Sequence, residues 1–84
     1  MSNTRFDVPV AVKFGLPVQE AILRTAQDAS DFLLNNWPGK RSPKHREALQ
    51  ACHDAISGAK PVMAARRAFL AVAREAGVAV TAGV

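Results

Sequence analysis

Apolar and polar residues alternate strictly near the start of the chain. The apolar positions are Phe6, Val8, Val10, Val12 and Phe14. Because successive side chains of a strand point to opposite faces, this period of two predicts a half-buried β-strand over residues 6–14. Pro9 has no N–H to donate to a neighbouring strand, so we expect this strand to lie at the edge of its sheet.

A second extended segment follows at residues 18–24, after the break Gly15-Leu16-Pro17. Two extended segments joined by a short turn predict a β-hairpin. Three consecutive apolar residues, 21–23, leave open which face of the second strand is buried.

Helical spacing of apolar residues then predicts three helices, over residues 26–36, 43–57 and 61–76. Thr25 is favoured over Ser30 as the first N-cap because Asp28 then lies in the first turn, where a carboxylate suits the helix dipole. Ser42 caps the second helix, and proline opens both the second and the third.

The two longer helices each have one apolar face, and glycines at 58 and 77 end them. On the second helix the face comprises His45, Ala48, Leu49, Cys52, Ala55 and Ile56. On the third it comprises Val62, Ala65, Phe69, Val72, Ala73 and Ala76. Residues 78–81 are extended in character and form a candidate third strand, since a lone hairpin is marginally stable.

These elements predict the α+β class: a β-hairpin packed against three helices in a single domain over residues 1–84, with disordered tails at 1–5 and 81–84. A chain of 84 residues that is 49% hydrophobic buries enough surface for one modest core. Its single cysteine favours a reducing compartment, and no apolar run approaches the roughly 18 residues of a membrane-spanning helix. We expect a cytoplasmic protein without membrane association.

Positive charge is concentrated in one segment. The chain carries a formal net charge of +4, and residues 40–46 contain four cationic side chains and no acid. Lys40, Arg41, Lys44 and Arg46 lie at the predicted start of the second helix, where an anion would be favoured. They are the candidate residues for binding nucleic acid or another anion.

A second candidate surface lies on the third helix, where Met63, Arg67, Leu70 and Arg74 share an outer sector. Exposed Met63 and Leu70, together with the predicted edge strand, would offer a surface for a protein partner or for self-association. A protein-interaction module is therefore the leading hypothesis, with nucleic-acid or anion binding as the alternative.

The residues that could carry catalysis do not converge. His45 and Cys52 lie about 10.5 Å apart along one helix, and His53 diverges from Cys52 by a hundred degrees. Three Cys and His residues on one helix lack the paired spacing of a zinc site. Carboxylates have no evident partners, and glycines occur singly, so no nucleotide-binding loop is predicted. We expect a non-enzymatic protein without cofactor or metal.

The order of several short motifs resembles the family DUF982. The motifs are Pro9-Val10, Leu33-Leu34-Asn35-Asn36-Trp37-Pro38, the segment from Ala48 to Cys52, Ala65-Arg66-Arg67-Ala68-Phe69 and Glu75-Ala76-Gly77-Val78. This family comprises short proteins found mostly in rhizobia and related alphaproteobacteria. The resemblance covers about residues 8 to 80 and implies a shared fold in a bacterial cytoplasm, with no catalytic residues to carry over.

Overall fold

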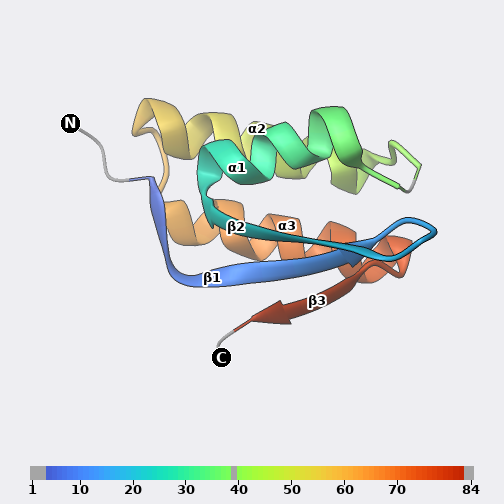
Figure 1. Cartoon of the computed structure of the whole chain (residues 1–84). Coiled ribbons are helices and arrows are strands. Elements are labelled where there is room, and N and C mark those ends of the chain that lie inside the picture. The colour runs from blue at the N-terminus through green and yellow to red at the C-terminus, as the bar shows by residue number, and fades with distance from the viewer. Residues whose placement is uncertain (1–3, 39, 83–84) are drawn as a thin grey trace.

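A three-stranded antiparallel sheet is packed against helices on one side in the computed structural model, which describes residues 4–38 and 40–82 (Figure 1). The elements, in chain order, are β1 (Arg5–Phe14), β2 (Gln19–Thr25), α1 (Ala26–Asp31), the π-helix η1 (Phe32–Asn36), α2 (Pro43–Ser57), α3 (Val62–Ala76) and β3 (Ala79–Ala82). The predicted α+β class is confirmed, with the hairpin preceding the helices.

β1 is the central strand, so the prediction that it lies at the sheet edge was wrong. The strand order is β2-β1-β3, and among the described residues β3 pairs with Val10–Lys13 of β1. β3 follows α3 near the other end of the chain and runs antiparallel to β1, on the side of β1 opposite β2 (Figure 1).

A large bulge explains how Pro9 is tolerated in a central strand. Arg5 pairs with Thr25 and Val10 pairs with Leu23, so the four residues 6–9 lie opposite Arg24 alone. Pro9 lies inside this bulge, where the hydrogen-bond ladder is already interrupted. Its missing N–H therefore removes no ladder hydrogen bond. Figure 1 shows the resulting bend near the start of β1.

Aromatic rings join the sheet to the helices. Phe32 meets Phe14 edge-to-face at 5.0 Å between ring centroids, and it lies 6.0 Å from Phe69. Trp37, half-buried at the core edge, lies 6.2 Å from Phe69 and 5.7 Å from the ring of His45. This cluster holds α3 and the start of α2 against the turn that ends the first helix.

The predicted helix ends are confirmed at their caps. The Thr25 hydroxyl accepts a hydrogen bond from the Asp28 N–H, and the Ser42 hydroxyl accepts one from the His45 N–H. Gly58 and Gly77 end α2 and α3 in the left-handed conformation, at φ of 86° and 71°. Both positions favour glycine, because a Cβ is strained at positive φ.

The first predicted helix, residues 26–36, is α-helical only as far as Asp31 and then becomes the π-helix η1. In π-helical bonding the Leu33 carbonyl would accept from the residue five positions later, which is Pro38 and has no N–H. The His45 Nε2 lies 2.9 Å from this oxygen. A carbonyl only accepts, so Nε2 is the donor.

Parts of the segments predicted as disordered tails, 1–5 and 81–84, belong to the regular structure. Arg5 begins β1, and the Thr4 carbonyl accepts a hydrogen bond from the Ala26 N–H at 2.9 Å. Residues 81 and 82 belong to β3, while 1–3 and 83–84 lie outside the described residues. Within the described ranges, no helix has the length and apolar character needed to cross a membrane.

Candidate binding groove between β1 and α3

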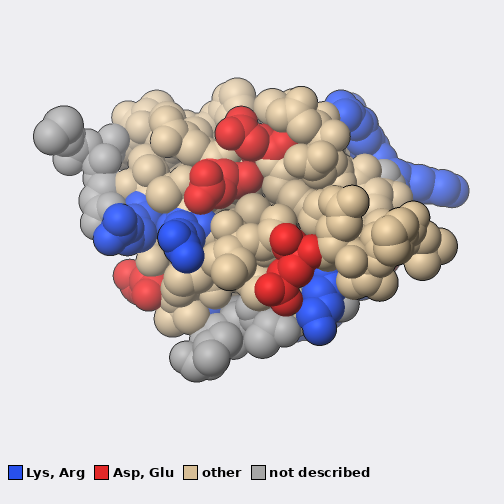
Figure 2. Space-filling model, viewed as in Figure 1, with Lys and Arg blue, Asp and Glu red and all other residues tan. Residues whose placement is uncertain are grey.

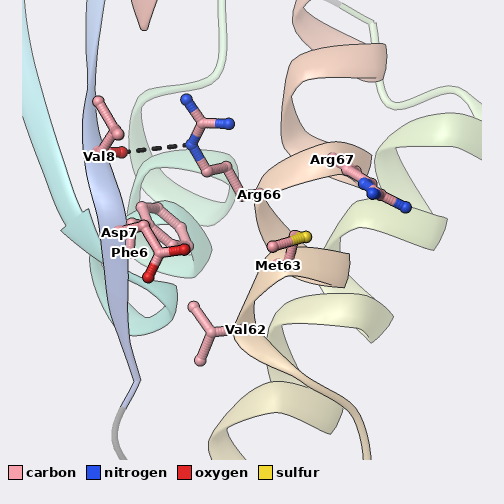
Figure 3. A pocket seen from close by; sticks show the side chains of 7 residues that line it. All are labelled: Phe6, Asp7, Val8, Val62, Met63, Arg66 and Arg67. Atoms are coloured by element: carbon pink, nitrogen blue, oxygen red, sulfur yellow. Dashed lines mark hydrogen bonds between the residues drawn. The ribbon is translucent and has the colours of Figure 1, made fainter. Parts of the chain in front are cut away.

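A pocket of about 300 Å³ lies between the bulged half of β1 and the first two turns of α3 (Figure 3). We call it the β1–α3 groove. Its lining residues are Phe6, Asp7, Val8, Val62, Met63, Arg66 and Arg67. The groove therefore combines an apolar base with three charged side chains, a composition typical of small binding sites.

The strand side of the groove contains a backbone edge that no described strand pairs with. Among the described residues, no strand pairs with residues 6–9 on the β3 side of β1, because β3 reaches only as far as Val10. Arg66 partly covers this edge, since its Nε donates a hydrogen bond to the Val8 carbonyl at 3.2 Å. Figure 3 shows its guanidinium lying between helix and strand. A side chain thus takes the place of a neighbouring strand.

The helical period of α3 places three of the groove residues on one face of the helix. Positions 63, 66 and 67 are three and four residues apart, so their side chains lie on one face of α3. The side chain of Met63 is 50% exposed, whereas Ala65, Phe69, Val72 and Ala73 of the same helix are buried. In Figure 3 Val62 points toward β1, whereas the Arg67 guanidinium points away from it along the rim.

The charges of the groove are not neutralised by neighbours. Within the described part of the chain, neither Asp7 nor Arg67 makes a side-chain hydrogen bond or ion pair, and Arg66 bonds only to a backbone carbonyl. The sequence of α3 contains one acid, Glu75, which accepts a hydrogen bond from Ser42 at 2.5 Å. Two guanidinium groups and one carboxylate are therefore available to a ligand.

The structure separates the four residues predicted as an interaction surface. Met63 and Arg67 line the groove, whereas Arg74 is exposed two turns further along α3 and is not among the lining residues. Leu70 was expected to be exposed, and this was wrong: it is half-buried and packs against the core. The position beside Phe69 turns it partly toward the interior.

Five residues of the groove were missed by the sequence reasoning: Phe6, Asp7, Val8, Val62 and Arg66. The strand residues were assigned to the sheet and Val62 to the core. The run Arg66-Arg67 was a usable signal, since two adjacent cations cannot both lie on the outermost line of one helix.

The basic segment forms a corner of the molecule, where Figure 2 shows Lys and Arg side chains projecting beside the connection from η1 to α2. Its residues have different roles. The Arg41 Nη2 donates to the Leu34 carbonyl at 2.9 Å, and the Lys40 carbonyl accepts from the Trp37 Nε1 at 3.2 Å. Lys44 and Arg46 are exposed at the start of α2, which Ser42 already caps.

The hairpin tip is a further exposed apolar feature. Leu16 is 97% exposed and Val18 is 66% exposed, and the Leu16–Pro17 peptide bond is cis. Turns usually carry small or polar residues, so two large and exposed apolar side chains are unusual here. The sequence signal was available, but Gly15-Leu16-Pro17 was interpreted only as a break between strands and Val18 as the start of the second strand.

The residues considered for catalysis lie apart. Cys52 is fully buried, and desolvation raises the pKa of its thiol to about 11, which keeps it protonated. His45 is buried and bound to the Leu33 carbonyl, while His53 is exposed on the other side of α2. Across residues 4–38 and 40–82, no group of three or more His, Cys, Asp or Glu side chains is placed to hold a metal ion.

The fold and groove define a small α+β protein with a surface pocket between its central strand and its last helix. The model of the family DUF982, described as "Protein of unknown function", matches residues 8–80, and the chain belongs to this family. Neither a curated protein nor a solved structure is significantly similar to the chain.

Proposed function

We propose that this protein is a non-enzymatic binding module that holds a segment of a protein partner in the β1–α3 groove. The observation that carries the proposal is the position of Met63, a flexible apolar side chain left half exposed inside a pocket whose other wall is the part of β1 that no described strand pairs with on its β3 side. Methionine adapts its shape to different apolar partners, and open strand edges pair with extended peptides.

The proposed setting is the bacterial cytoplasm. The single cysteine of the chain is a buried free thiol, and a reducing compartment maintains that state without a disulfide partner. The bacterial setting is proposed because the family that the chain belongs to comprises mainly alphaproteobacterial proteins.

A displayed random-peptide library tests the groove against segments of many different sequences at once. Peptides selected on the wild-type protein should bind a Met63→Glu variant at least tenfold more weakly, because a carboxylate then occupies the apolar part of the pocket. Ala76→Glu is the matched control, since it adds the same charge at an exposed position near the end of α3, outside the groove. Enriched peptides that bind both variants equally well, or a library that yields none, would overturn the proposal.

Nucleic-acid or anion binding at the basic corner is a second candidate function. Lys40, Lys44 and Arg46 form no ion pair and no side-chain hydrogen bond with the described residues. The test is fluorescence anisotropy with labelled mixed-sequence DNA and RNA at low and physiological salt. Binding that weakens steeply with salt and is lost when these three residues become glutamine would support it. Arg41 stays unchanged, because it bonds to the Leu34 carbonyl.

A further inference from the structure

The charges of the β1–α3 groove indicate what kind of segment it binds. Arg66 and Arg67 stand on the helix side, and Asp7 is the one acid among the lining residues. Figure 3 shows Asp7 on the strand and both arginines on the helix, so the positive charge is concentrated along one wall. A ligand with a negative charge on that wall would be favoured over a neutral or basic one.

The apolar base of the groove adds a second requirement. Val62 and Met63 lie about one helical turn before the arginines, and Phe6 faces them from β1 (Figure 3). A ligand that fills this base and reaches Arg67 must therefore carry an apolar side chain close to a carboxylate. A simple inorganic anion would not use the apolar base.

The open edge of β1 adds the third requirement, which is an extended backbone. The Val8 carbonyl is an edge acceptor that Arg66 now covers from a helix 58 residues away in the sequence. A peptide strand lying along residues 6–8 could take over this acceptor with its own N–H. Release from Val8 would leave the Arg66 guanidinium free to pair with a carboxylate of the same peptide.

From these three observations we infer that the ligand of the groove is an extended acidic peptide segment in which an apolar side chain and a carboxylate are two residues apart, so that both point to the same side of the strand. This inference rests on the proposed function. The carboxylate lies on the α3 side with Arg66 and Arg67, the apolar side chain contacts Met63, and the peptide backbone runs along residues 6–8 of β1.

Three synthetic peptides of equal length test the inference, with the repeats Leu-Ser-Asp-Ser, Leu-Ser-Asn-Ser and Leu-Ser-Lys-Ser, in which the two variable groups share one face of an extended strand. Binding is measured by fluorescence anisotropy, and the contacted amides are mapped by NMR in the isotope-labelled protein. We expect the Asp peptide to bind most tightly and to shift the amides of residues 6–8 and 62–67. Arg67→Gln should weaken its binding roughly fivefold, as expected for an exposed ion pair.

Arg74→Gln is the matched control, because it removes the same charge from the same helix outside the groove. The inference is supported if the Asp peptide binds Arg74→Gln as tightly as wild type and binds Arg67→Gln more weakly. Equal binding of the Asp and Asn peptides at the groove amides would overturn the charge preference while leaving the groove function intact. Shifts confined to residues 40–46 would overturn the assignment to the groove. If no peptide shifts the groove amides, the inference fails together with the proposed function.

Discussion

The side chain of Arg66 on α3 donates a hydrogen bond to the Val8 carbonyl on β1, with 3.2 Å between Nε and oxygen. This contact joins two elements that no regular hydrogen-bond ladder connects. It also defines the inner wall of the groove, because the guanidinium lies across the stretch of β1 that β3 does not reach.

We predict that Arg66→Gln lowers the free energy of unfolding by about 1 kcal/mol, because the edge carbonyl loses a charged donor while water can still reach it. Chemical denaturation at neutral pH measures the change. The control is Arg67→Gln, because the Arg67 guanidinium has no partner among the described residues. This substitution should change the free energy of unfolding by less than about 0.5 kcal/mol. Equal effects of the two substitutions would show that the Val8 bond has no stabilising role.

His45 should be a structural residue rather than a chemical one. His45→Phe keeps an aromatic ring at this position but leaves the buried Leu33 carbonyl without its donor, so we expect the free energy of unfolding to fall by about 2 kcal/mol. His53→Phe on the exposed side of the same helix is the comparison and should change stability little. A similar midpoint of thermal unfolding for His45→Phe and wild type would contradict this role.

The buried thiol of Cys52 should not react while the protein is folded. Thiol reagents modify the thiolate, and burial raises the pKa of Cys52 to about 11, so at pH 8 we expect labelling only after denaturation. The shift also predicts a pH dependence. The unfolded thiol ionises first, so this contribution to stability is complete below pH 9.0 and is lost as pH rises toward 11. Rapid labelling of the native protein would contradict the burial.

The apolar hairpin tip should influence association and leave folding unchanged. Leu16→Ser and Val18→Ser remove exposed apolar surface, so the free energy of unfolding should change by less than about 0.5 kcal/mol. We expect the double variant to self-associate less than wild type at high concentration, measured by sedimentation velocity. Identical sedimentation of both proteins at every concentration would mean that the tip takes no part in self-association.

Local signals were enough to predict most of the elements. The alternation from Phe6 to Phe14, the caps at Thr25 and Ser42 and the glycines at 58 and 77 act over a few residues, and the structure has each of them in its expected role. The π-helical turn was not predicted, because it depends on a side chain of the next helix reaching the Leu33 carbonyl.

The groove could not be predicted because it depends on distant parts of the chain. Val8 and Arg66 are 58 residues apart in the sequence. No sequence pattern predicts that the start of α3 packs beside the bulge of β1 rather than beside its regularly paired residues 10–14. Pro9 was recognised as incompatible with a regular ladder, but a bulge in a central strand satisfies that condition as well as an edge position does. Met63 and Arg67 were found because their exposure follows from the helical period alone.

Blocking the groove with a covalent group tests its role most directly. Met63→Cys and Ala71→Cys each place one reactive thiol on α3, and the buried Cys52 should stay unlabelled under native conditions. Each variant is joined to the same bulky maleimide, and the affinity for a library-selected peptide is measured before and after labelling. We predict that labelling at position 63 abolishes binding while labelling at position 71 leaves it unchanged. Equal affinity of both labelled proteins would contradict a binding site in the β1–α3 groove.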